Sequence, residues 1–272
     1  MKHERGPAGG SKIMKRLGLA LLAVVVTSTV SFADTQVDRS VELTGNSVSI
    51  EMISGKLTIE GTGDSNVVIK GVLRSDCEKL DVTSSKSGVK VEVDWTCSGN
   101  RRSYSADSEL TVSLPRRAKL GVEVVSTDVS VTGMEGDVKG ETISGTLEVR
   151  GDSKSLDLSS VSGRIALSGS SPLENLDLET VSGTIEAEVD PGSDASLDLQ
   201  TVSGHITIRL PQSASADFDV TSFSGSISND LGPAAKKTSD VLPSSELKFS
   251  LGGGGARIRI ESLSGRIEIR KR

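Results

Sequence analysis

Residues 174–189 read ENLDLETVSGTIEAEV, and residues 196–210 read SLDLQTVSGHITIRL. In both stretches apolar and polar residues alternate on either side of a Val-Ser-Gly tripeptide. A period of two is typical of a β-strand with one buried face and one solvent face. Glycine permits a tight bend that a Cβ would obstruct. Each stretch is therefore predicted to form two short strands joined by a Ser-Gly corner.

A large apolar residue followed by Ser and Gly occurs seven times in the chain. The copies are Ile53-Ser54-Gly55, Ile143-Ser144-Gly145, Val161-Ser162-Gly163, Val181-Ser182-Gly183, Val202-Ser203-Gly204, Phe223-Ser224-Gly225 and Leu263-Ser264-Gly265. From Gly145 to Gly225 the motif glycines are 18 to 21 residues apart, and Gly265 follows after 40 more. Repeats of this length predict a stack of equivalent units, because one unit cannot close a core alone.

The predicted fold is all-β, a single-stranded parallel β-solenoid (β-helix-like) with rungs of about 20 residues. The alternative is an antiparallel sandwich or a propeller, whose strands also come in short alternating runs. Propeller blades need units of about 40 residues. The regular spacing of single units favours the solenoid.

Three regions are expected. Residues 1–33 form a signal peptide, residues 34–120 an irregular N-terminal β cap with the first rungs, and residues 121–272 the regular repeats, with a loop interruption near 229–245. Strands in the cap are predicted near 48–51, 57–60, 67–73, 89–95 and 109–114. Cys77 and Cys97 are expected to pair as a disulfide that ties the cap together, since an even number of cysteines in an exported chain favours one. Two separate buried thiols are the alternative.

The signal peptide is predicted from three features in order. Lys12, Lys15 and Arg16 form a basic segment, Leu17 to Val26 an apolar run, and Ser31-Phe32-Ala33 a site of small residues for the peptidase. An uncleaved N-terminal anchor is the alternative. No later stretch is apolar enough to span a bilayer. The protein is therefore expected in the periplasm, or secreted to the cell surface.

Charge and composition limit the partners. The chain has 31 Lys+Arg against 37 Asp+Glu, and without residues 1–33 the balance becomes 26 against 36. Nucleic acid is disfavoured, because phosphate contacts require a basic surface. An acidic surface suits cations or a basic partner. The partner class, an envelope protein or a polysaccharide, is left open, as is the oligomeric state.

The Val-Ser-Gly-x-Ile repeats, with Gly252–Gly255 just before the last one, resemble a known family. It is the widespread, uncharacterised bacterial β-strand-repeat family described as candidate adhesins, related to adhesin head domains. The resemblance covers roughly residues 40–270 and is best over 140–228 and 252–270. It implies a solenoid fold and carries over no catalytic residue, because its motif is structural. The segment 75–120, with its two cysteines, departs from the pattern.

No catalytic, cofactor-binding or metal-binding residue is predicted. His205 is the one histidine after residue 33, and it occupies an outward, polar position of the repeat. The motif serines recur in every unit, whereas a catalytic serine would be singular. They are predicted to bond backbone groups at the corners. Phe218 and Phe223 are expected at core positions.

One set of carboxylates shares a register, six residues before each motif glycine. It consists of Asp157, Asp177, Asp198 and Asp219, with Lys139 and Arg259 expected to flank the row at its two ends. This aspartate ladder is predicted to be a solvated surface feature, able at most to attract divalent cations weakly or to meet a basic partner.

The functional prediction is a non-catalytic exported module with an envelope-structural, interaction or adhesin-like role. The alternative is a polysaccharide-active enzyme using the aspartate ladder, because a glycosidase needs two nearby carboxyl groups.

Cleavage after Ala33 is testable by mass. The intact mass of protein recovered from a periplasmic extract should correspond to a chain that begins at Asp34. A mass that retains Lys12 to Ala33 would contradict both the cleavage site and the release of the protein from the membrane.

Overall fold

The computed structural model describes residues 34–74, 78–96, 108–237 and 244–272, and these residues form one sheet of 17 strands. The all-β prediction is confirmed. The strands are β1 (Thr35–Glu42), β2 (Ser47–Thr62), β3 (Asn66–Leu73), β4 (Glu78–Ser84), β5 (Gly88–Trp95), β6 (Glu109–Pro115), β7 (Lys119–Thr132), β8 (Val138–Ser144), β9 (Thr146–Arg150), β10 (Ser155–Ser160), β11 (Arg164–Thr180), β12 (Thr184–Leu210), β13 (Ala216–Ser222), β14 (Ser226–Asn229), β15 (Lys236–Lys237), β16 (Ser245–Leu251) and β17 (Ala256–Lys271). Within the described ranges, no helix has the length and apolar character needed to cross a membrane.

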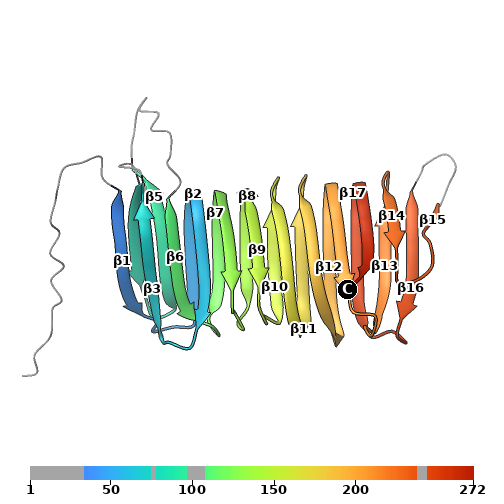
Figure 1. Ribbon diagram of the computed structural model, residues 1–272, viewed down its shortest axis with the longest axis horizontal. Coiled ribbons are helices and arrows are strands. Elements are labelled where there is room, and N and C mark those ends of the chain that lie inside the picture. Colours follow the sequence, from blue (N-terminus) through green and yellow to red (C-terminus); the bar gives the residue numbers. More distant parts are fainter. Residues whose placement is uncertain (1–33, 75–77, 97–107, 238–243) are drawn as a thin grey trace, which may run out of the picture. The chain divides into compact units, whose positions relative to one another are not determined.

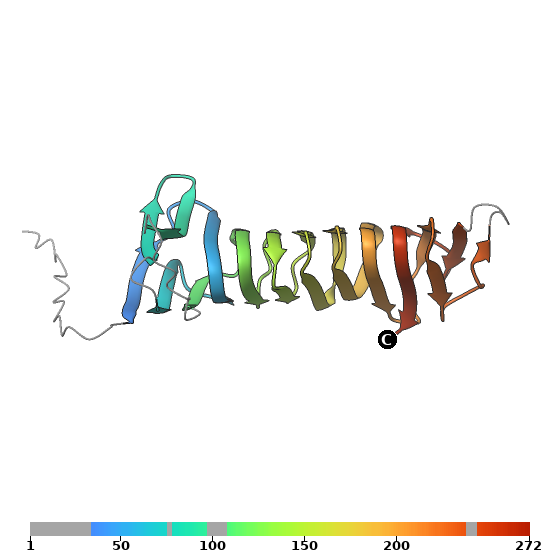
Figure 2. The same ribbon diagram turned by 90° about the horizontal axis from the view of Figure 1, so that it is seen from above.

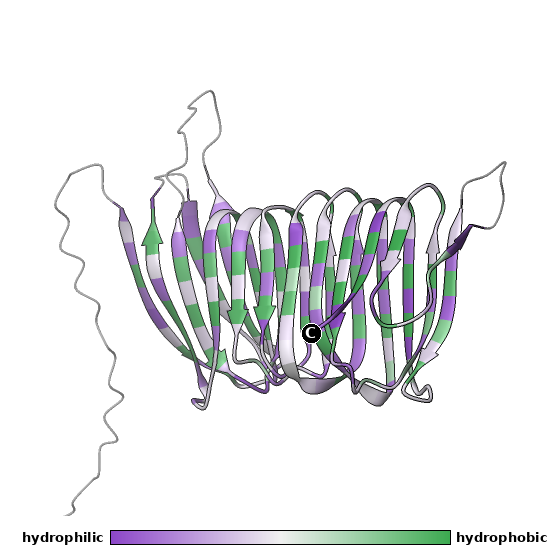
Figure 3. Cartoon of the chain, turned by 45° about the vertical axis from the view of Figure 1, so that its right-hand side comes forward, coloured by the Kyte–Doolittle hydropathy of each residue, from purple (hydrophilic) through white to green (hydrophobic). Residues whose placement is uncertain are grey.

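The chain bends at each Ser-Gly corner, so that each motif unit, here called a rung, contributes a strand to each of two layers (Figure 2). The strand before the corner pairs with its equivalents in one layer, and the strand after it pairs in the other. Leu176, Leu178 and Ile185 point between the layers and are fully buried, while the residues between them point outward. Figure 3 shows this alternation of apolar and polar residues along the strands. The inward residues of both layers form one hydrophobic core.

The motif strands pair in parallel with equivalent residues side by side. Asp177 lies between Asp157 and Asp198, and Ile185 lies next to Ile165. Register is enforced because a slip of one residue would turn each core side chain toward solvent.

The corner glycines make the closest contacts between rungs. A Cβ at Gly183 would lie 2.0 Å from the carbonyl oxygen of Gly163, and one at Gly204 would lie 2.0 Å from that of Gly183. The same carbonyl of Gly163 accepts a hydrogen bond from the backbone N–H of Thr184 at 3.2 Å. Glycine is needed here because a side chain would push apart two backbones that are hydrogen-bonded to each other.

The prediction of a single-stranded parallel β-solenoid was wrong, because the chain does not wind rung after rung. The last strand, β17, lies between β12 and β13 (Figure 1), and β2 pairs with β5, β6 and β7. Antiparallel pairs are present at both ends: β1 with β3, β3 with β6 and β4 with β5, then β13 with β16 and β15 with β16. The physical reason is that equivalent rungs are interchangeable as neighbours, so a repeat does not specify their order.

The predicted disulfide-tied cap also needs correction. Strand β2 is a complete rung, because its residues 47–60 pair in register with β7. At this end β5 and β6 pair with β2 in parallel, β3 and β4 pair antiparallel with those two strands, and β1 pairs antiparallel with β3. Cys77 and Cys97 lie outside the described residues, as does the signal peptide at 1–33. In the predicted interruption at 229–245, residues 236–237 form β15, and residues 238–243 lie outside the described part.

Replacing Gly183 by alanine should destabilise the protein by about 1–3 kcal/mol, the usual cost of overpacking. The new methyl group would overlap the Gly163 carbonyl. In a chain of this size, each kcal/mol lowers the melting temperature by about 2–4 °C. Gly121→Ala is the matched control, because its Cβ would meet no atom closer than 4.0 Å. Equal melting temperatures for the two variants would contradict the role given to the corner.

Candidate functional site

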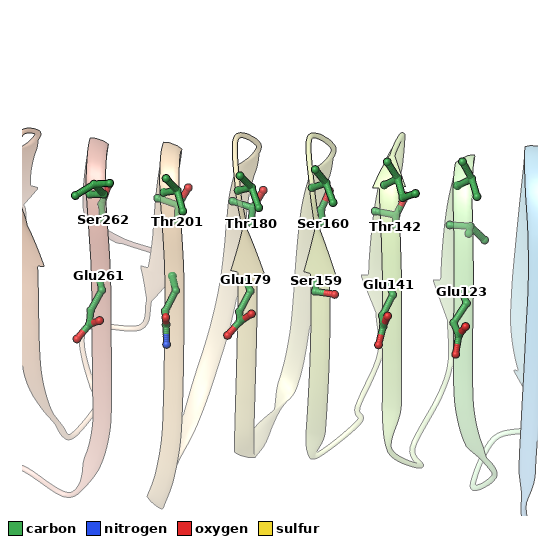
Figure 4. A pocket seen from close by; sticks show the side chains of 18 of the residues that line it. Glu123, Glu141, Thr142, Ser159, Ser160, Glu179, Thr180, Thr201, Glu261 and Ser262 are labelled. Atoms are coloured by element: carbon green, nitrogen blue, oxygen red, sulfur yellow. The ribbon is translucent and has the colours of Figure 1, made fainter.

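A long open groove runs across the rungs on the outer face of one layer. Its volume is about 1160 Å³, and residues from β2, β5, β7, β8, β10, β11, β12, β13, β16 and β17 line it. Ligand pockets for small molecules usually measure about 300–1,000 Å³. Each rung contributes the same three consecutive positions to the lining, so the groove is built of three rows (Figure 4).

The first row, named the apolar row, consists of the large residue that opens each of the seven motifs, together with Val125, which holds the equivalent position in β7. These side chains point outward and are 41–53% exposed. In stack order they are Ile53, Val125, Ile143, Val161, Val181, Val202, Leu263 and Phe223. Each lies one residue past a buried position, so strict alternation turns it away from the core. Eight large apolar side chains in one exposed line need an explanation, because soluble proteins rarely expose a contiguous apolar surface.

The second row, named the acidic row, lies two residues before each member of the apolar row, with Glu92 of β5 and Glu246 of β16 added at its two ends. Seven of its ten positions are glutamate. In stack order it reads Glu92, Glu51, Glu123, Glu141, Ser159, Glu179, Gln200, Glu261, Thr221 and Glu246. Figure 4 shows Glu123, Glu141, Glu179 and Glu261 in this row, with Ser159 between Glu141 and Glu179. The groove therefore has one negative side and one apolar side.

Between these rows lies a row of buried hydroxyl groups that supports the corners. The Oγ of Ser160 accepts a hydrogen bond from the Gly163 N–H at 2.7 Å, and the Oγ1 of Thr180 accepts one from the Gly183 N–H at 2.9 Å. The equivalent Thr201, Ser222 and Ser262 hydroxyls are buried without a hydrogen-bond partner among the described residues. At Ser160 and Thr180 the hydrogen bond from the glycine N–H helps to hold the corner in place.

Lysines form ion pairs with the acidic row at some rungs. At other rungs the carboxylates have no such partner. Lys90 Nζ lies 3.0 Å from Glu51 and 2.8 Å from Glu92, and the hydrogen bond from Lys90 holds the pKa of Glu92 below its ordinary value. Lys139 Nζ lies 2.9 Å from Glu141 Oε1, and Lys248 Nζ lies 3.2 Å from Glu246 Oε1.

Three carboxylates of the acidic row have no such partner. Glu123, Glu179 and Glu261 form no ion pair with any residue in the described ranges. They are the third, sixth and eighth of the ten members in stack order, so the unpaired carboxylates are spread along the groove.

The aspartate ladder lies on the same layer, beside the groove and not among its lining residues. Asp157, Asp177 and Asp198 are neighbours in register, as the spacing predicted. Arg259 does not flank the row. It lies between Asp198 and Asp219, because β17 inserts between β12 and β13.

Cations accompany three of the four aspartates. Lys139 Nζ lies 4.0 Å from Asp157 Oδ2, and Arg259 Nε lies 3.8 Å from Asp198 Oδ1. Lys248 Nζ lies 3.1 Å from Asp219 Oδ2. Burial raises the pKa of the remaining member, Asp177, and the negative charges of Glu179, Asp157 and Asp198 add to that rise. Over the part of the chain that the structure describes, no group of three or more acidic, histidine or cysteine side chains is placed to hold a metal ion.

Other predicted positions have clear outcomes. His205 is exposed, as the pattern indicated, whereas Phe223 was wrongly expected in the core and is one of the apolar row. Phe218 is buried and stacks on Phe249 with ring centroids 4.4 Å apart. The motif serines bond backbone groups of the neighbouring rung, as when Ser162 Oγ donates to the Ile143 carbonyl at 3.1 Å.

Sequence reasoning missed the apolar row, although its signal was present. Leu178 points inward, so period-two counting places Val181, three positions later, on the outer face. The apolar residue type predicted a core position, whereas the alternation correctly predicted a position on the surface.

The fold and the rows together define a class: all-β repeat proteins in which stacked, glycine-cornered rungs present continuous rows of equivalent side chains. Within that class the chain belongs to the Toastrack DUF4097 family, whose family model matches residues 28–270. The family resemblance inferred from the Val-Ser-Gly repeats is thereby confirmed.

Several solved structures are similar to this chain. A candidate adhesin from Bacteroides fragilis is 11% identical, with a TM-score of 0.46 over 90% of this chain and 100% of that one. A candidate cell adhesion protein from Clostridium sporogenes is 13% identical, with a TM-score of 0.39 over 88% and 100%. A candidate lipid-binding protein from Parabacteroides distasonis is 11% identical, with a TM-score of 0.32 over 87% and 96%. Among proteins of curated function, none matches significantly.

The raised pKa of Asp177 leads to a stability prediction. A carboxyl group whose pKa is higher in the folded state binds its proton more tightly there, so its contribution to stability falls as pH rises from the ordinary value through the raised one. At neutral pH its charge is therefore a small penalty. Asp177→Asn should raise the free energy of unfolding in low salt by no more than about 0.5 kcal/mol, since solvent screens this exposed position.

The measurement is thermal melting at neutral pH in low and high salt, where the gain should shrink as salt screens the neighbouring charges. Asp219→Asn is the matched control. It should give no gain, because it removes a charge that pairs with Lys248. A lower melting temperature for Asp177→Asn would show that the charge of Asp177 stabilises the folded state, which is the opposite of the prediction.

Proposed function

We propose that this protein is an exported, non-catalytic interaction module, located in the periplasm or at the cell surface, that binds a partner along the groove. The single observation that carries the proposal is the apolar row. Eight large side chains that are about half exposed form one uninterrupted line from Ile53 to Phe223. Burying them against a partner would release ordered water, which is the main driving force of protein association.

The groove has the chemical layout of a binding surface. Interfaces combine an apolar centre with a polar rim, and here the apolar row and the acidic row run in parallel. Its volume exceeds the usual range for small-molecule pockets, which favours an extended partner. The basic and apolar segment before Ala33 supports export.

A polysaccharide-active enzyme is less well supported. Its proposed carboxylates, the aspartate ladder, lie beside the groove and outside its lining, and three of the four have cationic neighbours. Within the ladder only Asp177 has a raised pKa, as a general acid requires. The groove therefore favours binding over hydrolysis.

Site-specific photocrosslinking in cells tests the proposal without assuming the partner. A photoreactive phenylalanine derivative at Val181 or Val202 should give a discrete higher-mass adduct after irradiation. The same derivative at Glu60, an exposed residue of β2 outside the groove, should give none. Adducts that are absent at both groove positions, or equally strong at Glu60, would refute the proposed binding surface.

A further inference from the structure

We propose that the occupant of the groove is a basic amphipathic α-helix of a partner polypeptide. This inference rests on the proposed function and adds the chemistry of the partner. Three properties of the groove define it: the unneutralised carboxylates, the spacing of the apolar row and the direction in which the rows run.

The charge of the groove selects a basic partner. Glu123, Glu179 and Glu261 form no ion pair within the described residues, and Asp177 lies two residues before Glu179 on the same strand. Lysine or arginine side chains of a partner would supply the missing counter-charges, as complementary potentials do at interfaces. A second copy of this chain that packed its apolar row on this one would also bring two acidic rows together, so self-association through the groove is disfavoured.

The direction of the rows selects a helix over a strand. The rows cross the strands, since each successive member comes from the next rung. A peptide added as a strand would have to pair with a sheet edge, and the groove is a sheet face. A helix instead lies on a face and presents apolar side chains at i, i+3, i+4 and i+7.

The spacing of the rows fits helical geometry. Strands in a sheet are about 4.8 Å apart, and a helix advances about 5.4 Å per turn. One turn of a helix laid along the groove therefore meets about one rung. The eight members of the apolar row extend over about 34 Å, which corresponds to a helix of about 22 residues.

In this arrangement the apolar stripe of the helix packs on the apolar row, and basic residues on one flank reach the acidic row. The two rows lie two residues apart on each strand, about 6–7 Å. That separation is within the diameter of one helix, about 10–12 Å with its side chains. Both rows can thus contact the same helix.

The test uses a synthetic peptide of about 22 residues, made of leucine and lysine with the leucines on one helical face. A scrambled peptide of the same composition, with no apolar face, is the comparison. Fluorescence anisotropy with the purified protein should show binding of the amphipathic peptide and at least about tenfold weaker binding of the scrambled one, because only the former can bury an apolar stripe.

Two groove variants separate the contributions. Glu179→Gln with Glu261→Gln should weaken binding roughly tenfold in low salt and much less in high salt, because the lost attraction is electrostatic. Val181→Ser with Val202→Ser should weaken it by a similar factor that salt does not change. Glu42→Gln with Glu60→Gln removes the same charge outside the groove and should leave binding unchanged.

Several results would overturn the inference. They are equal affinity for the scrambled peptide, equal losses in the control and groove variants, or binding of phosphatidylglycerol vesicles or a soluble glucan in place of the peptide. If crosslinking at Val181 succeeds while the peptide fails to bind, the groove is a binding surface for a partner of other chemistry. If both fail, the proposed function fails as well.

Discussion

The close approach of backbones at the Ser-Gly corners is the constraint on which the rest of this structure depends. A Cβ on Gly183 would lie only 2.0 Å from the carbonyl oxygen of Gly163, and the same close approach recurs from rung to rung. Only this proximity lets the strands on both sides of each corner pair at normal sheet spacing. Buried hydroxyl oxygens such as those of Ser160 and Thr180 then accept hydrogen bonds from the backbone N–H groups of the corner glycines.

Stacking equivalent corners has a consequence at the surface. Because like residues lie beside like, any residue type that recurs at one position becomes a continuous row. Such rows have an energetic cost where the residues carry the same charge, and the chain offsets it locally with Lys90, Lys139, Lys248 and Arg259. Glu123, Glu179 and Glu261, which form no ion pair within the described residues, keep the surface negative at intervals along the groove.

This regularity also bears on function. Catalysis depends on a few groups whose surroundings differ from those of their neighbours, as when one carboxyl group of a pair has a raised pKa. Here one carboxyl group of the aspartate ladder, Asp177, has a raised pKa, but it lies beside the groove, which is lined by repeated residues along the stack. In the proposed interaction the apolar row would supply the hydrophobic surface that is buried, and the acidic row would supply selectivity for a basic partner.

Period-two alternation in the sequence was sufficient to assign the all-β class, most strand positions, the outward placement of His205 and the register of Asp157, Asp177 and Asp198. These are local properties, because the side on which a residue lies depends on its near neighbours along the strand. The order of the rungs is not local. Rungs with the same pattern can pair in any order, so only the tertiary structure decided that β17 inserts between β12 and β13 and that Arg259 separates Asp198 from Asp219. The groove also depends on the tertiary structure, because it forms only when eight rungs align their exposed apolar residues.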